Sequence, residues 1–349
     1  MKEQSKNKVI IGMSGGVDSS VAAKLLQKKG YEVIGVYLDF WKDIVGKNNG
    51  YEDAKKVASI LGIELHKVDA RNEFKREVVN YFLREFQEGR TPNPCVICNP
   101  TMKFKILLEA SEEFSCDFVA TGHYAQIKDG KLFQGVDKSK DQSYFLYGLT
   151  KRQLQKIMFP LGKYTKDEVR EIAYEEKLPV AEKPESQDIC FIRNGDFRGF
   201  LEEHLEIEDG DIIDSEGNIL GRHAGLPFYT IGQRRGINLG GNGPYYVAGK
   251  DSDKNRIIVT NEKDSEMLYE KDMIVSNVNW ISDDIEFPLE MYIKIRYRTS
   301  AIKATISPVE NSTHFFKVEF SKPQKAVTPG QSAVFYGKNE AVIGGGIIN

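Results

Sequence analysis

Ile10-Ile-Gly-Met-Ser-Gly-Gly-Val-Asp-Ser-Ser20 is the stretch that decides the fold of the N-terminal part of this chain. The β-branched run Val9 to Ile11 predicts a buried strand, and the pattern after Ser19 predicts a helix. Between them, Gly15 and Gly16 permit backbone conformations in which N–H groups surround an anion. Because the loop leads into a helix N-terminus, we expect it to bind the phosphates of a nucleotide.

The loop differs from the Walker loop G-x-x-x-x-G-K-[ST], because no Lys follows its glycines. It also differs from the dinucleotide-binding motif, because the spacing G-x-G-x-x-G is missing. The string S-G-G-V-D-S resembles the PP-loop of the ATP pyrophosphatases, which bind the β,γ-pyrophosphate of ATP while a substrate oxygen attacks the α-phosphate. This resemblance implies an adenylated intermediate and a role for Asp18 in holding Mg²⁺. The residues expected to bind ATP are Gly12, Met13, Ser14, Gly15, Gly16, Val17, Asp18, Ser19, Leu38 and Gly122. The alternative is an ordinary glycine-rich turn.

Strands and helices alternate after this loop. Apolar runs at 33–38 and 64–68 flank a helical stretch at 51–61, and this rhythm predicts a parallel sheet with helices on both faces. Ligands of such sheets bind at the carboxyl ends of the strands, where we place Leu38 beside the adenine and Gly122 near the same crevice. Leu38 is equally compatible with a purely structural position in the core.

Further along the α/β part, helices are expected at 72–87, 103–114, 149–161, 165–177 and 196–205, the fourth capped by Thr165 and Glu168. Prolines at 92, 94 and 100 predict an ordered loop that carries Cys95 and Cys98.

From residue 210 onward, short strands are expected at 211–213, 228–231, 245–248 and 256–260, and alternation at 292–298 and 315–320 predicts a small β-barrel. We therefore expect an α/β PP-loop catalytic domain at 1–207, a small, mainly β central domain at 208–278 and a C-terminal β-barrel at 279–349.

Composition narrows the functional classes. The 349 residues are 40% hydrophobic and 28% charged, which is typical of globular proteins, and the net charge of −3 provides no general attraction to nucleic acid. An RNA partner would have to bind to local basic patches. No apolar run suits a membrane span, and residues 1–8 are too polar for a signal peptide, so we expect a cytoplasmic protein.

Four cysteines without a secretory signal favour reduced thiols used for metal binding, redox chemistry or nucleophilic attack. Cys95-Val-Ile-Cys98 alone is compatible with a redox pair or with half of a zinc site, whose second pair is missing. Cys116 is expected to be a small buried residue. Cys190 lies 92 residues after Cys98, so only the fold can bring these two together.

Six motifs in order resemble the bacterial and mitochondrial tRNA 2-thiouridylases over essentially the whole chain: S-G-G-V-D-S, G-R-T-P-N-P with a cysteine before M-K-F-K, A-T-G-H-Y, D-Q-S-Y-F-L, D-I-C-F-I and P-G-Q-S-A-V-F-Y. The resemblance implies an ATP-dependent sulfurtransferase that adenylates the wobble uridine of tRNA and replaces its oxygen with sulfur. The products would be 2-thiouridine, AMP and pyrophosphate. A cysteine desulfurase would supply the sulfur, directly or through a relay protein.

The resemblance also assigns roles to residues. Cys98 corresponds to the nucleophile and Cys190 to the persulfide-bearing cysteine, and a disulfide between them would have to be reduced after each turnover. Asn93, Pro94 and Cys95 correspond to contacts with the flipped target base. The implied tRNA contacts are His123, Lys140, Asp141, Gln142, Tyr297, Arg298 and Gln331.

Cys95 departs from the family pattern, which has an Asp in this place that is proposed to act as an acid or base. One hypothesis is that Cys95, Cys98 and Cys190 bind an iron–sulfur cluster that carries the sulfur, and the other is a persulfide on Cys190. Two other functions stay open. A PP-loop ligase or amidotransferase acting on a small molecule would need no thiols, and an RNA-binding protein would keep only a vestigial nucleotide site.

Overall fold

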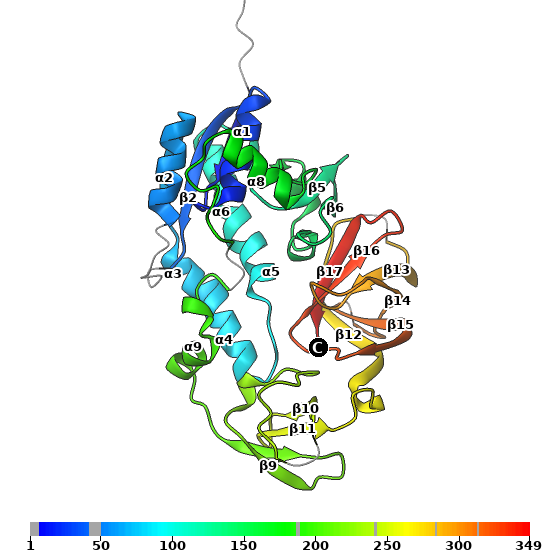
Figure 1. The fold of residues 1–349 in the computed structure, drawn as a ribbon. Helices are drawn as coiled ribbons and strands as arrows, with labels where there is room; N and C mark the ends of the chain where they lie inside the picture. Colours follow the sequence, from blue (N-terminus) through cyan, green and yellow to red (C-terminus); the bar gives the residue numbers. More distant parts are fainter. Residues whose placement is uncertain (1–6, 42–49, 186–188, 241–242, 283–284, 313) are drawn as a thin grey trace, which may run out of the picture.

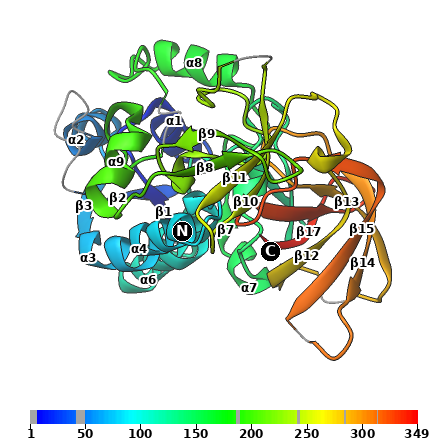
Figure 2. The same cartoon turned by 90° about the horizontal axis from the view of Figure 1, so that it is seen from below.

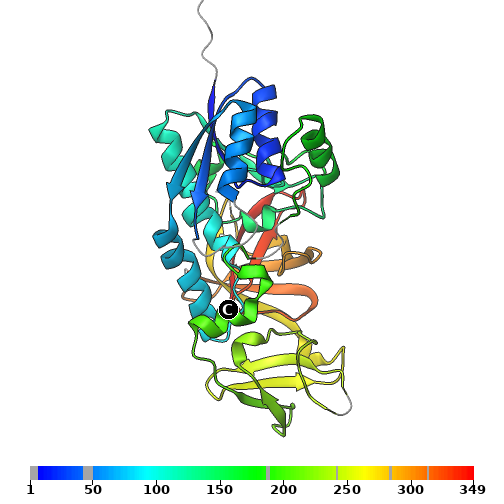
Figure 3. The ribbon, with the colours of Figure 1, turned by 60° about the vertical axis from the view of Figure 1, so that its left-hand side comes forward.

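The computed structural model describes residues 7–41, 50–185, 189–240, 243–282, 285–312 and 314–349. Three parts follow one another along the chain: an α/β domain, a small four-stranded sheet and a closed β-barrel (Figure 1). In Figure 3 the four-stranded sheet lies at one end of an elongated molecule. The expected fold class is confirmed in all three parts.

The sheet of the α/β domain consists of β1 (Lys8–Gly12), β2 (Glu32–Asp39), β3 (Glu64–Asp69), β4 (Phe118–Ala120) and β7 (Ile157–Met158). Their order in space is β3-β2-β1-β4-β7, and all neighbouring strands run parallel. Ile10 of β1 lies opposite Ile34 of β2 on one side and Val119 of β4 on the other. The most apolar strand is therefore central, which is why its side chains are buried on both faces.

Helices cover both faces of this sheet. Val9 and Ile11 pack toward one face with α1 (Val17–Lys28), α2 (Gly50–Leu61) and α8 (Lys166–Glu175). Ile10 points the other way and packs with Phe104 and Leu107 of α6 (Phe104–Glu113). The alternation follows from the two-residue period of a strand, and it places the end of β1 between the two layers.

The expected helix at 72–87 is confirmed as a continuous helix made of α3 (Arg71–Phe74), the π-helical segment η1 (Lys75–Val79) and α4 (Asn80–Gln87). The expected loop around Cys95 and Cys98 is wrong. Both thiols lie on α5 (Pro94–Cys98), which continues through the π-helical segment η2 (Asn99–Lys103) into α6. Pro94 occupies the first turn of α5, where a backbone N–H would have no partner within the helix, so a proline is tolerated. The Asn93 side chain caps the helix by accepting from the Cys95 N–H at 3.1 Å.

A long helix at 149–161 is also wrong. Only α7 (Lys151–Leu154) is helical, and the chain then forms the edge strand β7. Before it stand the hairpin β5 (Ala125–Lys128) and β6 (Lys131–Gln134) and the 3₁₀ turn η3 (Ser143–Phe145). The capping box of α8 is confirmed, since Thr165 and Glu168 bond to each other's backbone N–H groups. The short η4 (Arg193–Gly195) precedes α9 (Phe197–His204), the helix expected at 196–205.

The middle sheet contains β8 (Gly210–Ile213), β9 (Ile219–His223), β10 (Tyr246–Asp251) and β11 (Arg256–Thr260) in the order β10-β11-β8-β9. The strand expected at 228–231 is wrong, because the 3₁₀ turn η5 (Leu226–Phe228) ends there and irregular chain follows. Leu226 and Tyr229 still pack in the small core of this sheet, so the apolar pattern indicated burial and not strand pairing.

The C-terminal barrel follows the short turn η6 (Glu266–Leu268) and closes in the order β12-β15-β14-β13-β16-β17. Its strands are β12 (Tyr269–Trp280), β13 (Leu289–Lys294), β14 (Ile302–Pro308), β15 (Phe315–Lys325), β16 (Ser332–Tyr336) and β17 (Val342–Ile348). The expected boundary after residue 278 falls inside β12, which pairs with both β15 and β17.

The barrel packs directly against the α/β domain, and Figure 2 shows the two side by side. The Tyr144 hydroxyl donates to the Ser332 carbonyl at 2.8 Å, and both residues are fully buried. The Thr91 N–H donates to the Pro329 carbonyl at 2.9 Å, beside α5. These contacts hold the barrel close to the thiol-bearing helix. Among the described residues, no helix has the length and apolar character needed to cross a membrane.

Candidate active site

A cleft of about 480 Å³ opens at the carboxyl ends of β1, β2 and β4. Its walls come from segments far apart in the sequence, including the glycine loop, α5 and the segment around Cys190. The lining includes these residues singled out from the sequence: Gly12, Met13, Ser14, Asp18, Ser19, Leu38, Pro94, Cys95, Cys98, Gly122, His123, Gln142 and Cys190. The fold thus joins the expected nucleotide loop with the expected thiols.

The glycine loop has the geometry of an anion site. Gly15 has a φ of +72°, and a β-carbon there would collide with the Gly50 carbonyl oxygen. Gly16 caps α1 without a side chain, so the first N–H groups of the helix keep no side-chain partner. The hydroxyls of Ser14 and Ser19 lie 3.3 Å apart beside them. Gly15, Gly16 and Val17 shape the loop without lining the cleft.

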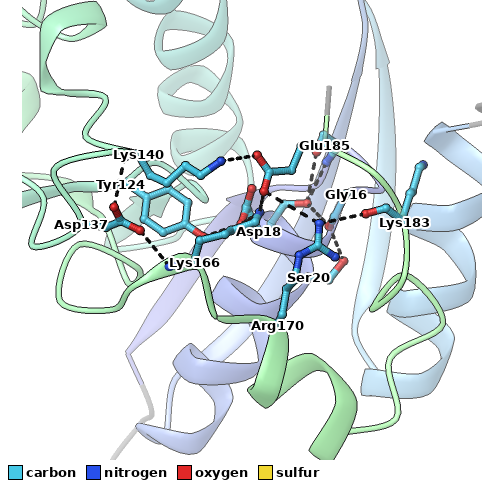
Figure 4. Close-up of polar contacts among 12 residues, drawn as sticks. Gly16, Asp18, Ser20, Tyr124, Asp137, Lys140, Lys166, Arg170, Lys183 and Glu185 are labelled. Carbon is cyan, nitrogen blue, oxygen red and sulfur yellow. Dashed lines mark hydrogen bonds and ion pairs between the residues drawn. The ribbon is translucent and has the colours of Figure 1, made fainter. Parts of the chain in front are cut away.

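Asp18 forms a partly buried contact that the sequence did not reveal (Figure 4). Its Oδ1 accepts from the Tyr124 hydroxyl and from the Lys166 Nζ, both at 2.7 Å. Lys166 is 7% exposed. Burial and the neighbouring Asp18 raise the pKa of Tyr124, which therefore stays a hydroxyl donor. One signal was available, since Lys166 stands in the first turn of α8, where the helix dipole disfavours a cation.

Glu185 lies at the centre of the cations in Figure 4. Its carboxylate is 2.6 Å from Lys140, 3.4 Å from Lys166 and 3.8 Å from Arg170. Lys183 donates to the Gly15 carbonyl at 2.9 Å and to Asp53 at 2.7 Å. The loop has no lysine of its own, and the fold brings two lysines to it from beyond residue 160.

The three cysteines of the cleft form no disulfide. Cys98 is buried, whereas Cys95 and Cys190 are exposed. Loss of hydration within the cleft walls raises the pKa of Cys98 to about 11 and that of Cys190 to about 12, and it also raises the pKa of Cys95. At neutral pH the thiols of the free protein are therefore protonated. Cys116 lies outside this cleft and is half-buried, where full burial was expected.

His123 is buried and takes part in a polar chain beside the thiols. Its Nδ1 lies 2.7 Å from the Thr121 hydroxyl, and its Nε2 lies 3.4 Å from Lys103 Nζ. Lys103 also donates to the Asn99 side-chain oxygen at 3.0 Å. Burial, helped by the charge of Lys103, lowers the pKa of His123 well below 6.5, so the imidazole is neutral at pH 7.

The other residues expected to contact tRNA have different surroundings. Asp141 is 4% exposed, and its carboxylate accepts from the Gly135 and Ser143 N–H groups. Its side chain is therefore a structural acceptor in this conformation. Gln142 lines the cleft. Lys140 is paired with Glu185, as described above.

The barrel contributes the remaining expected contacts. The centre of the Tyr297 ring lies 4.4 Å from the centre of the Phe145 ring, and Phe145 lines the cleft. Arg298 is exposed in the turn that follows β13. Gln331 donates to the Thr91 carbonyl at 2.7 Å, so its side-chain amide helps to join the barrel to the α5 side. Tyr297 thus brings the barrel to the rim of the cleft.

The same cleft offers no complete set of metal ligands among the described residues. Within the described ranges, no three side chains of His, Cys, Asp or Glu are grouped so that they could hold a metal ion. Cys95, Cys98 and Cys190 line one cleft but do not fit a cluster, and Asp18 is already engaged by Lys166. We therefore assign no metal ligand to these residues.

A glycine loop between a parallel strand and a helix, opening on a cleft at the strand ends, defines a nucleotide-binding α/β domain. The family described as tRNA methyl transferase HUP domain matches residues 7–194. The tRNA methyl transferase PRC-barrel domain matches residues 198–261, and the aminomethyltransferase beta-barrel domain matches residues 270–348.

Full-length relatives identify the family more closely. The chain is 46% identical over 361 aligned residues to tRNA-specific 2-thiouridylase MnmA 2 of Thermoanaerobacter sp. (strain X514), covering 98% of each chain. It is 44% identical to tRNA-specific 2-thiouridylase MnmA 1 of Geobacillus kaustophilus, covering 99% of this chain and 96% of that one. For tRNA-specific 2-thiouridylase MnmA of Clostridium perfringens the identity is also 44%, with 99% of each chain covered. The chain belongs to the tRNA-specific 2-thiouridylase family.

Proposed function

We propose that this protein is an ATP-dependent tRNA-uridine 2-sulfurtransferase, which converts the wobble uridine of tRNA to 2-thiouridine. The observation that carries the proposal is the shared cleft: Cys98 and Cys190, 92 residues apart, line the same cavity as the glycine loop. A ligase or amidotransferase acting on a small molecule would need the loop but not the thiols. The names of the full-length relatives support the same activity.

In the first step, ATP binds with its pyrophosphate on the glycine loop. The O2 atom of the flipped uridine attacks the α-phosphate, the bond to the β-phosphate breaks, and pyrophosphate leaves. Lys166 and Lys183 lie against the loop and supply positive charge there. ATP would bring Mg²⁺ held by its phosphates and by water, because Asp18 is paired with Lys166.

In the second step, the terminal sulfur of a Cys190 persulfide attacks the activated ring carbon. The Cys98 thiolate then attacks the Cys190 sulfur, the bond between Cys190 and the transferred sulfur breaks, and AMP departs with the former O2. The products are 2-thiouridine and a Cys98–Cys190 disulfide, which an external dithiol reduces. Because the three thiols do not form a set of metal ligands, we prefer the persulfide to an iron–sulfur cluster.

For the substrate, we propose that the target base enters the cleft beside Pro94 and Cys95, with Asn93 shaping this wall as the cap of α5. His123, Lys140, Gln142, Tyr297, Arg298 and Gln331 remain our proposed tRNA contacts, whereas Asp141 is buried and serves as an internal acceptor. Arg298 is exposed and suits a phosphate. A cysteine desulfurase, directly or through a relay protein, would load the persulfide on Cys190, which is exposed.

The experiment is reconstitution with unmodified tRNA, ATP, a cysteine desulfurase with cysteine, and a dithiol reductant, followed by mass spectrometry of the nucleosides. We expect 2-thiouridine from the wild type and none from Cys98→Ser or Cys190→Ser. Cys116→Ser is the matched control because its thiol lies outside the cleft, and it should retain full activity. Thiolation by protein that contains no iron would support the persulfide and exclude the iron–sulfur cluster as the sulfur carrier.

Other outcomes point to other functions. Retained activity in both serine variants would exclude the thiol mechanism. A methylated nucleoside in place of a thiolated one would favour the activity that the domain descriptions name. Pyrophosphate release without tRNA, dependent on a small acid, would indicate a ligase. Binding of tRNA with no release of pyrophosphate would indicate an RNA-binding protein.

A further inference from the structure

Lys103 is a cation that the steps above do not use. Among the described residues that line the cleft, it is the one cationic side chain. No carboxylate in the described part of the chain lies within ion-pair distance of its Nζ. The two carboxylates in the lining already have cationic partners, since Asp18 contacts Lys166 and Asp39 contacts Lys67 at 2.9 Å. The charge of Lys103 is therefore available for an anion in the cleft.

The local fold holds this ammonium group in place. Its two hydrogen-bond partners are the neutral Nε2 of His123 and the Oδ1 of Asn99, and neither cancels its charge. Asn99 is buried and is oriented by its own N–H donation to the Phe145 carbonyl at 2.9 Å. His123 is oriented by Thr121 and packed between Phe104 and Phe159. A flexible lysine is thus fixed by two oriented acceptors.

The π-helical turn explains how Lys103 comes to lie near the thiols. In an α-helix, side chains three or four residues apart share a face, and a residue five positions after Cys98 would not. Lys103 ends the π-helical segment Asn99–Lys103, whose wider turn contains one more residue. Single π-helical turns inside α-helices occur frequently at functional sites.

We propose that Lys103 is the positioning residue that stabilises anionic sulfur in this cleft, namely the thiolate of Cys98 and the terminal sulfur of the Cys190 persulfide. This inference rests on the proposed function for its biological meaning. The anion is sulfur because Lys103 lines the same cleft as all three thiols. In line with this placement, the charge of Lys103 lowers the pKa of each thiol, whereas loss of hydration raises it. The titratable and charged side chains facing the cleft are Asp18, Tyr37, Asp39, Cys95, Cys98, Lys103, His123 and Cys190.

The test measures the alkylation rate of each cysteine by iodoacetamide against pH, with peptide mass spectrometry, in the full-length protein without ATP or tRNA. The reagent is uncharged, so removing a lysine does not alter its attraction to the cleft. In Lys103→Met we expect the Cys98 midpoint to rise by about one pH unit, which is about tenfold slower alkylation at a fixed pH. Lys103→Arg should keep the wild-type midpoint.

Two controls keep the result interpretable. Lys105→Met removes an exposed charge from the same helix and should leave Cys98 unchanged. Lys103→Gln, which keeps a neutral N–H donor at this position, should reproduce the midpoint shift with a wild-type melting temperature even if Lys103→Met unfolds. Equal midpoints in the wild type and both neutral variants would overturn the proposal, and weaker ATP binding alone would assign Lys103 to the phosphates instead. Because the assay needs no thiolation, it separates this inference from the proposed activity.

Discussion

Gly122 offers the sharpest test of how the α/β domain positions ATP. A β-carbon on this residue would lie 2.8 Å from the carbonyl carbon of Asp18 and 2.8 Å from the Ser19 nitrogen. Ordinary contact begins at 3.4 Å, so the first turn of α1 would have to move by about 0.6 Å. Both neighbours are backbone atoms and cannot rotate away. Overpacking of this kind costs about 1–3 kcal/mol.

We expect the N–H groups of the displaced turn to bind the pyrophosphate of ATP. Displacing them should therefore lower the affinity for ATP. We predict that Gly122→Ala raises the Kd for a non-hydrolysable ATP analogue about tenfold, equivalent to about 1.4 kcal/mol. Isothermal titration calorimetry measures this directly. The defect should extend to pyrophosphate release in the presence of tRNA.

Two glycines serve as controls for this variant. Gly346→Ala places a β-carbon 2.6 Å from the Ser276 carbonyl oxygen inside the barrel, and it should lower the melting temperature with unchanged ATP affinity. Gly240→Ala meets open space and should change neither property. Wild-type affinity in Gly122→Ala would refute the placement of the pyrophosphate against this turn.

Three further predictions concern buried polar groups. Lys166→Met should lower the free energy of unfolding by about 1–2 kcal/mol, as measured by urea titration. This value is smaller than for a fully buried ion pair because the Asp18 side chain is 35% exposed. Adding Asp18→Asn should recover part of the loss. Burial lowers the pKa of His123, so the unfolded chain binds a proton that the folded protein rejects as pH falls below 6.5. The neutral His123 therefore contributes to stability above pH 6.5, and this contribution declines below pH 6.5 by up to about 1.4 kcal/mol per pH unit. The free energy of unfolding of His123→Gln, measured against pH, should lack this decline. Tyr144→Phe leaves the buried Ser332 carbonyl without its donor and should cost about 1 kcal/mol, whereas Tyr292→Phe, which is 40% exposed, should cost nothing measurable.

Local patterns in the sequence were sufficient for much of the fold. The strand, glycine loop and helix at residues 8–28 follow from β-branched residues, glycines and helical periodicity, all of which act over a few residues. The capping box of Thr165 and Glu168 is equally local. The ordered motifs were sufficient for the family, because each carries its own residue types and spacing.

Predictions failed where the outcome depends on distant partners. Prolines between residues 92 and 100 do not prevent a helix when Asn93 caps it and Pro94 begins it. Residues 157–158 form a strand because the edge of β4 is available to pair with them, which helical periodicity cannot reveal.

The tertiary structure alone brought the thiols of Cys98 and Cys190 to the cleft of the glycine loop. It also placed Lys166 and Lys183 against that loop and left Lys103 without a carboxylate partner in the described chain. The physical reason is that charge, hydration and reactivity depend on the atoms surrounding a side chain. Those atoms come from segments that only folding brings together.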